Sequence, residues 1–227
     1  MQLNFEIYKH TKFYKKLNQL KEPFLNDLKK CFLGSKCIPK NITLMTQNQN
    51  LQYLYLIYDG SIAFEMTTLG GKTYQLGNVK CDHTIIGEME FYSNTLIQST
   101  VVASEKINVE VISIALLEQL LEEKPEYHLI FTTSLSYDYL DSLDVMYQRI
   151  LHPISYNIAI DLLKTEKKLT SFNSSIKEAE RFGTSDRVYR RAVKGLIELN
   201  LITKEKNKLV IVDRKKLEEY IESMQIG

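Results

Sequence analysis

The spacing of hydrophobic positions changes twice along the chain, and each change predicts a different kind of structure. Between residues 42 and 114, short apolar and β-branched runs alternate with turn residues, a pattern typical of a β-barrel or jelly roll. From residue 115 to 151 the spacing becomes helical, and after residue 152 short helical segments surround a smaller pair of strands. The sequence therefore predicts an α+β chain with a double-stranded β-helix or jelly-roll barrel at 1–123, a long dimerisation helix at 124–151 and a winged helix-turn-helix at 152–227.

The barrel region begins after a helical lead at residues 3–36, where Lys alternates with Leu, Phe and Tyr. Asp59-Gly60 separates two apolar runs and predicts a hairpin, and Gly70-Gly71 predicts a second turn. The expected strands are 43–45, 51–58, 61–67, 72–76, 99–103 and 107–114.

The long helix predicted for residues 126–151 contains no Gly or Pro. Seven of its residues recur at spacings of four and three, which is a heptad pattern: Leu129, Thr133, Ser136, Leu140, Leu143, Tyr147 and Ile150. Two interpretations stay open, a coiled-coil seam between two copies of the chain and one amphipathic helix packed on its own barrel. The dimer seam would use Leu129, Leu140, Leu143, Tyr147 and Ile150.

His152-Pro153 predicts a break after the long helix. Ser175 and Glu178 fit a capping box at the start of a short helix, which meets Gly183 before a second helix that reaches about Leu199. A helix, a short glycine turn and another helix are typical of a helix-turn-helix. Strands at 201–204 and 208–212 predict a wing, and a last helix is expected at 214–223.

The second helix of this pair carries four basic residues and no acid between Arg187 and Lys194. Arginine can contact guanine with two hydrogen bonds, and both basic residue types neutralise phosphates. A helix N-terminus with hydroxyl side chains can also hold a phosphate. The alternative is an ordinary solvated basic face. The predicted DNA-binding residues are Thr184, Ser185, Asp186, Arg187, Arg190, Arg191 and Lys194.

Charge and composition agree with two domains in a reducing compartment. Residues 1–151 hold 14 basic and 17 acidic residues, whereas residues 152–227 hold 15 and 11, so the second part is the one suited to a polyanion. Three widely spaced cysteines are typical of a cytoplasmic protein rather than a disulfide scaffold. We expect no signal peptide and no membrane helix, because no apolar run is long enough.

The order of elements and residues over about residues 24–212 resembles the Crp/Fnr family of transcription regulators. Ile86-Gly87-Glu88-Met89 is similar to the family's pocket motif, and residues 183–202 are similar to its recognition helix and following strand. Gly87-Glu88 with Glu90, and the tail at 214–217, resemble a YeiL-like branch. The resemblance implies a cytoplasmic homodimer that binds double-stranded DNA, with RNA polymerase as a further partner. It places an effector pocket at Gly87, Glu88, Met89, Gln98 and Ser99.

Departures from the family pattern argue against its known cofactors. Cyclic-nucleotide-binding members pair the cyclic phosphate with an arginine eleven residues after the pocket glycine, where this chain has Gln98, and no arginine precedes Arg149. Glu88 and Glu90 would add uncompensated negative charge, so cyclic AMP is not the expected effector.

Metal and haem cofactors are not expected either. Iron–sulfur members use four cysteines, and Cys31, Cys37 and Cys81 do not fit a cluster spacing. His83 alone does not indicate haem, and Cys81-Asp82-His83 is a weak metal motif.

The residues of the predicted recognition helix also differ from the family pattern. The family usually offers Arg-Glu-x-x-x-Arg, and this chain has Asp186-Arg187-x-x-x-Arg191, so the resemblance predicts a different half-site, with Asp186 accepting from cytosine and Arg187 contacting guanine. Tyr189 is expected to pack against the first helix, with a phosphate contact as the alternative.

The sequence contains no Walker loop, HExxH, GxSxG or zinc pattern, so no enzyme is predicted. The alternative function is a ligand-sensing or protein-interaction module whose degenerate helix-turn-helix does not bind DNA.

Overall fold

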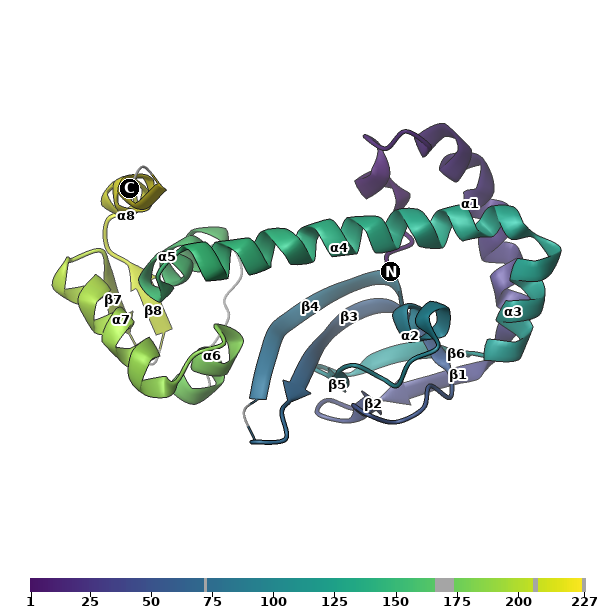
Figure 1. The fold of residues 1–227 in the computed structure, drawn as a ribbon, viewed down its shortest axis with the longest axis horizontal. Coiled ribbons are helices and arrows are strands. Elements are labelled where there is room, and N and C mark those ends of the chain that lie inside the picture. Colours follow the sequence, from purple (N-terminus) through teal and green to yellow (C-terminus); the bar gives the residue numbers. More distant parts are fainter. Residues whose placement is uncertain (72, 166–173, 206–207, 226–227) are drawn as a thin grey trace. The chain divides into compact units, whose positions relative to one another are not determined.

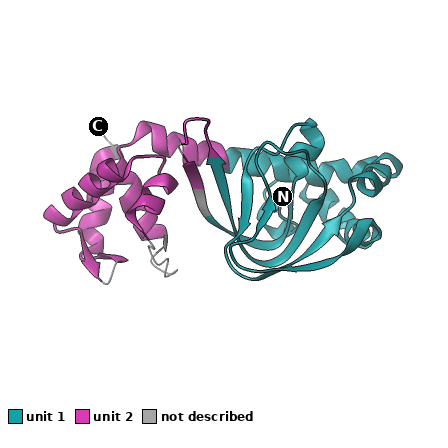
Figure 2. Ribbon diagram, turned by 90° about the horizontal axis from the view of Figure 1, so that it is seen from below, with its two compact units in different colours: residues 1–66, 76–141 teal, residues 67–75, 142–227 magenta. Residues whose placement is uncertain are grey.

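The computed structural model describes residues 1–71, 73–165, 174–205 and 208–225. The chain divides into two compact units, coloured separately in Figure 2. The N-terminal unit consists of residues 1–66 and 76–141, and the C-terminal unit of residues 67–75 and 142–227. The long helix α4 (His128–Leu151) contributes residues to both units.

A curled antiparallel sheet forms the N-terminal unit (Figure 1). Its strands are β1 (Phe32–Ile38), β2 (Thr43–Met45), β3 (Leu54–Thr67), β4 (Thr73–Ile86), β5 (Thr100–Ala103) and β6 (Ile107–Ile112). Five of them lie in the order β1-β6-β3-β5-β2, and β4 pairs with β3. This curled sheet confirms the predicted barrel-like fold class.

The interior of the sheet is filled by aliphatic side chains because successive strand residues alternate between its two faces. Burying one such side chain stabilises the fold by about 1.5–3 kcal/mol. Ten buried residues make up this cluster: Met45, Ile57, Ile62, Cys81, Ile86, Ile97, Val101, Ala103, Ile107 and Val109. All ten are hydrophobic, and they form one cluster inside the sheet.

A second core joins the sheet to the helices η1 (Phe5–Tyr8), α1 (Tyr14–Leu28), η2 (Lys29–Cys31), α3 (Ile114–Glu123), η3 (Pro125–Tyr127) and the first turns of α4. The Phe24 ring lies edge-on to the rings of Tyr127 and Phe131, with centroids 5.2 and 5.8 Å away. Beside them, the Asp27 carboxylate accepts hydrogen bonds from Lys124 Nζ at 2.6 Å and the Tyr127 hydroxyl at 2.7 Å. This carboxylate therefore ties α1 to the chain that leads into α4.

The hairpin predicted at Asp59-Gly60 is wrong, because β3 continues through both residues. Gly60 has φ +120°, and a Cβ there would lie 2.5 Å from Ile107 Cγ2. Glycine thus lets two strands approach closely at a bend, and the real turn to β4 lies around Gly71. Residues 32–36, which the sequence predicts to be helical, instead form part of β1. Residue 72, at the start of a predicted strand, lies outside the described residues.

The C-terminal unit contains α5 (Ile154–Thr165), α6 (Ser175–Arg181), α7 (Asp186–Glu198), β7 (Ile202–Glu205), β8 (Lys208–Ile211) and α8 (Arg214–Gln225). These elements confirm the predicted order, and α4 ends at Leu151, before the predicted break. The Arg181 guanidinium joins α6 to α5 by two bonds to the Asp161 carboxylate, at 2.6 and 2.7 Å. The wing turn predicted at residues 205–207 falls mostly outside the described residues.

Candidate nucleic-acid interface

Helix α6 begins one residue earlier than the predicted capping box. Ser174 is the N-cap, and its hydroxyl accepts a hydrogen bond from the Lys177 backbone amide at 3.2 Å. Glu178 does not return to a backbone amide, because its carboxylate pairs with Arg181 Nε at 2.9 Å. Burial raises the pKa of Glu178, and the neighbouring Arg181 opposes that rise. The capping-box prediction is therefore wrong in its residues, although the helix itself is present.

A tight left-handed turn joins α6 to α7. Gly183 has φ +65°, a conformation that side chains other than glycine rarely adopt. Its amide donates to the Glu180 carbonyl at 3.0 Å, and the Thr184 amide donates to the Ala179 carbonyl at 2.9 Å. Ser185 then caps α7 by accepting from the Val188 amide at 3.4 Å. These bonds satisfy the helix-end groups and fix the short connection between the two helices.

The two faces of α7 differ in polarity. Arg187, Arg190, Arg191 and Lys194 are exposed, whereas Tyr189 is only 5% exposed. The Tyr189 ring stacks on Phe182 with centroids 5.9 Å apart, and burial raises its pKa. The packing interpretation of Tyr189 is therefore confirmed.

Asp186 has a partner that the sequence interpretation did not consider. Its two carboxylate oxygens bind Arg190, at 3.0 Å from Nε and 2.9 Å from Nη2. Arg190 Nε also lies 3.2 Å from the Ser175 hydroxyl of α6. Two interactions lower the pKa of Asp186: the larger is a hydrogen bond from Ser175, and the smaller is the pairing with Arg190. In this conformation Asp186 orients Arg190 through both of its carboxylate oxygens, and its expected contact with a cytosine stays a prediction.

The other basic side chains of α7 are less restrained. Lys194 lies 3.5 Å from Glu198, and both groups are exposed, so this pair contributes little to stability. Within the part of the chain that the structure describes, Arg187 and Arg191 form no ion pair. Their guanidinium groups keep their hydrogen-bond donors for an external acceptor.

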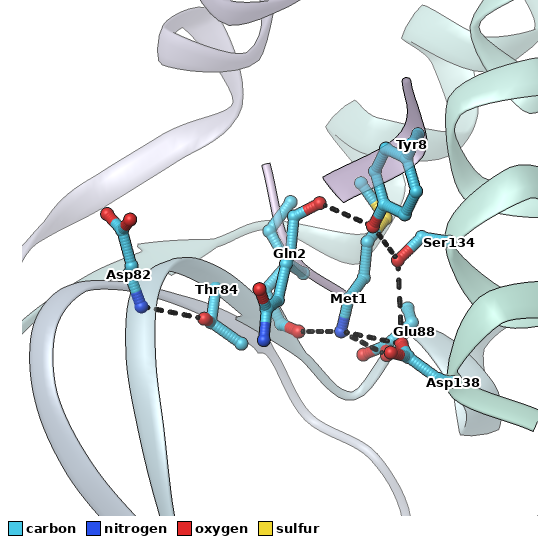
Figure 3. A network of polar contacts seen from close by, with 9 residues as sticks. Met1, Gln2, Tyr8, Asp82, Thr84, Glu88, Ser134 and Asp138 are labelled. Atoms are coloured by element: carbon cyan, nitrogen blue, oxygen red, sulfur yellow. Dashed lines mark hydrogen bonds and ion pairs between the residues drawn. The ribbon is translucent and has the colours of Figure 1, made fainter. Parts of the chain in front are cut away.

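The residues expected to form an effector pocket differ in burial and in their hydrogen-bond partners. Glu88 is 7% exposed, and its carboxylate accepts a hydrogen bond from the Met1 amino group at 2.6 Å (Figure 3). The same amino group donates to the Ile85 carbonyl oxygen at 2.8 Å and lies 3.6 Å from Asp138 of α4. Glu88 thus takes part in a polar network with the first residue of the chain.

This network extends to the long helix. The Tyr8 hydroxyl lies 2.7 Å from Ser134 Oγ and 2.9 Å from the Gln2 carbonyl oxygen, and Ser134 donates to Asp138 at 3.4 Å (Figure 3). Burial raises the pKa of Tyr8 to about 12. No periodicity or motif in the sequence points to the network, because its key contacts join groups more than 80 residues apart.

The remaining predicted pocket residues have different surroundings. Gly87 is buried with φ +94° and precedes the short helix α2 (Glu88–Ser93), where Met89 is exposed. The exposed Gln98 side chain donates to the Leu96 carbonyl oxygen at 2.8 Å, and its backbone amide donates to Glu90. Ser99 is half-buried just before β5. Glu88 and Gln98 therefore both have hydrogen-bond partners within the chain itself.

The apolar seam predicted on α4 divides into two halves. Leu129 packs against the core of the N-terminal unit, and Thr133 is buried there, so this half serves the chain's own fold. In the second half Leu140 and Ile150 are 62% and 70% exposed, Tyr147 is exposed, and Leu143 is half-buried. Their spacing of three and four places them on one side of the helix.

Other kinds of site find little support. Among the described residues, no three His, Cys, Asp or Glu side chains gather in a way that could hold a metal ion. Cys31 and Cys81 are buried thiols, and Cys37 is exposed. No described helix is both long and apolar enough to cross a membrane.

Comparison with known proteins identifies relatives by structure alone. No family model matches the sequence, and no curated protein matches it. A protein described as a Crp/Fnr-family transcriptional regulator from Eubacterium rectale superposes with a TM-score of 0.73 at 14% identity, covering 93% of this chain and 98% of its own. The c-di-GMP responsive global regulator CLP of Xanthomonas campestris gives 0.69 at 15% identity, covering 85% and 99%. A transcriptional regulator of Thermus thermophilus, also of the Crp/Fnr family, gives 0.64 at 14%, covering 84% and 100%.

At these identities the likeness establishes the fold. The match extends over most of this chain and nearly all of each neighbour. The fold expected from the resemblance in the sequence is therefore confirmed.

Proposed function

We propose that this chain, which has the fold of Crp/Fnr regulators, is a sequence-specific DNA-binding transcription regulator that acts as a homodimer. The observation that carries the proposal is the exposed basic face of α7, with Arg187, Arg190, Arg191 and Lys194. This helix is the second of a helix-turn-helix pair, it begins at a serine cap, and a two-stranded wing follows it. A helix of this kind enters the major groove, where arginine contacts guanine and lysine neutralises phosphates.

The dimer would form along the second half of α4. Leu140, Leu143, Tyr147 and Ile150 offer an apolar stripe that a second copy of the same helix can cover. Two recognition helices related by a two-fold axis would bind half-sites about 34–36 Å apart, so the target is a palindrome. We expect RNA polymerase as a further partner and the cytoplasm as the location, in line with three free cysteines.

The regulatory signal, in this proposal, is not a cyclic nucleotide. Hydrophobic side chains cluster inside the sheet, and the position of the family's phosphate-binding arginine is occupied by Gln98. Moving a phosphate into such surroundings without a cationic partner is strongly unfavourable. A different effector, or constitutive DNA binding, would suit this chain better.

A triple variant tests the DNA-binding proposal. Changing Arg187, Arg190 and Arg191 to alanine should abolish binding to a DNA site enriched by the wild-type protein, as measured by fluorescence anisotropy. These side chains are exposed, so circular dichroism should show an intact fold. Binding that survives the triple change would indicate a helix-turn-helix that does not read DNA through this face.

A further inference from the structure

A cavity of about 450 Å³ lies within the C-terminal unit, between α6, α7 and the β7–β8 wing. Its volume is within the range of small-molecule sites in proteins. Three basic side chains line part of it, Arg190, Lys194 and Lys204, and apolar side chains line another part, Val193, Ile197 and Leu209. The walls thus combine positive charge with an apolar surface.

One acidic residue, Glu178, also lines the cavity. Glu178 pairs with Arg181, at 2.9 Å from Nε and 2.8 Å from Nη2. Arg181 is also bound by Asp161, so one guanidinium that does not line the cavity is shared by two carboxylates. The wall still carries three cations against one carboxylate, and the carboxylate partners of Arg190 and Lys194, which are Asp186 and Glu198, do not line the cavity.

Arg190 is held in place before any ligand arrives. Asp186 and Ser175 fix its guanidinium through Nε and Nη2. Restraining a long side chain in advance lowers the entropy cost of binding. Lys194 and Lys204 are exposed and lie on the same wall, with Lys194 also 3.5 Å from Glu198.

We infer that this cavity binds a small organic anion with an apolar body. The anionic group would meet the cations of α7 and the wing, and the body would lie against Val193, Ile197 and Leu209. Arg190 and Lys194 belong to both the cavity and the exposed basic face of α7, so an occupant would weaken DNA binding. This competition rests on the proposed function, whereas binding of the anion does not.

The test uses hexanoate as the probe, with 1-hexanol as its neutral counterpart and inorganic phosphate as the anion without an apolar body. Methyl NMR signals of Val193, Ile197 and Leu209 are followed in the full-length protein during each titration. We expect saturable shifts with hexanoate and binding at least fivefold weaker for hexanol and for phosphate.

Lys204→Gln is the test variant, and Lys215→Gln on α8 is its control. Both lysines are exposed, and Lys215 does not line the cavity. Lys204→Gln should weaken hexanoate binding at least threefold, and Lys215→Gln should leave it unchanged.

Four results would overturn the inference: no saturable shift, equal binding of hexanol, equal binding of phosphate, or equal loss in both variants. If DNA shifts the same methyl NMR signals and hexanoate does not, the cavity is a binding site for the DNA backbone. Failure of DNA binding would leave the hexanoate result as it stands, so the two proposals can fail separately.

Discussion

The four basic side chains of α7 are not equivalent, although the sequence presents them as one group. Arg190 is bound by Asp186 on its own helix and contacts Ser175 on the preceding one. Arg187 and Arg191 form no ion pair with a described residue. We therefore expect base recognition to depend on Arg187 and Arg191, and Lys194 to contribute through phosphate charge.

Arg191→Ala should weaken binding to the selected DNA site by about 5- to 150-fold, which corresponds to about 1–3 kcal/mol. The loss should be much smaller on a site whose contacted base pair has been changed, because the base-specific contact is already missing there. Anisotropy titrations at a fixed salt concentration measure both. Arg214→Ala is the control, since Arg214 lies on α8 and pairs with Glu218. An equal loss on all sequences would contradict a base-reading role for Arg191.

Asp27 offers a separate prediction about pH. Hydrogen bonds from Lys124, Lys30 and Tyr127 hold the pKa of its carboxyl well below the usual range. Because the pKa of Asp27 is lower in the folded state than in the unfolded chain, its carboxylate stabilises the folded protein above about pH 4. This stabilisation is lost progressively as the pH falls below about 4. Asp27→Asn should cost about 1–3 kcal/mol at pH 7, because hydrogen bonds to a charged group are lost.

Urea unfolding at pH 7 and pH 3 measures this effect. The gap between wild type and Asp27→Asn should narrow at pH 3, because the carboxyl of the unfolded chain is then mostly protonated and must lose its proton on folding. Asp59→Asn, at an exposed position of β3, should show no such gap at either pH. A gap that stays constant between the two pH values would contradict the ionic role of Asp27.

At the scale of elements, the sequence predicted well what depends on local pattern. The glycine turn, the amphipathic α7 and the paired wing strands follow from residue spacing within about twenty positions. The bend at Gly60 could not be predicted, because it depends on Ile107 of a partner strand. The contact of Glu88 with Met1 and the clamp of Asp186 on Arg190 likewise require knowledge of which groups meet in space.

The long helix shows the same limit. Its heptad spacing extends from Leu129 to Ile150, yet the first half is used inside the N-terminal unit and the second half is exposed. Periodicity reports which side of a helix is apolar and not what covers it.

Charge introduced on the exposed half of α4 should therefore separate the dimer. Leu140→Glu with Ile150→Glu would place four like charges in the seam of a dimer and remove its apolar contacts. Sedimentation velocity at micromolar concentration should show a dimer for the wild type and a monomer for this variant. Leu33→Glu, a matched change at an exposed leucine of β1, should leave the dimer intact. A variant that stays dimeric would place the interface elsewhere.

At the scale of the whole molecule, the fold is shared with regulators that are about 15% identical, whereas the sequence predicts an effector other than cyclic AMP. The described interior cluster is apolar, and the pocket-motif glutamate is engaged by the Met1 amino group. From these residues we expect no binding of a cyclic nucleotide at this site.

Cyclic AMP at 1 mM should accordingly leave the melting temperature unchanged within about 1 °C. A ligand at 100 times its Kd would stabilise the folded state by about 2.7 kcal/mol and raise the melting temperature by several degrees. Differential scanning fluorimetry with and without the nucleotide makes the comparison. A rise of several degrees would show that the chain binds cyclic AMP despite Gln98.

The most direct test of the central claim is selection of DNA from a random pool by the purified full-length protein, without added ligand. The proposed function predicts an enriched palindrome whose half-sites lie one helical turn apart, centre to centre. Binding to that site should weaken steeply as salt rises, because several phosphates are neutralised. If no sequence is enriched, and binding to the pool is absent even at low salt, the chain does not read DNA by itself and the account of α7 as a recognition helix is contradicted.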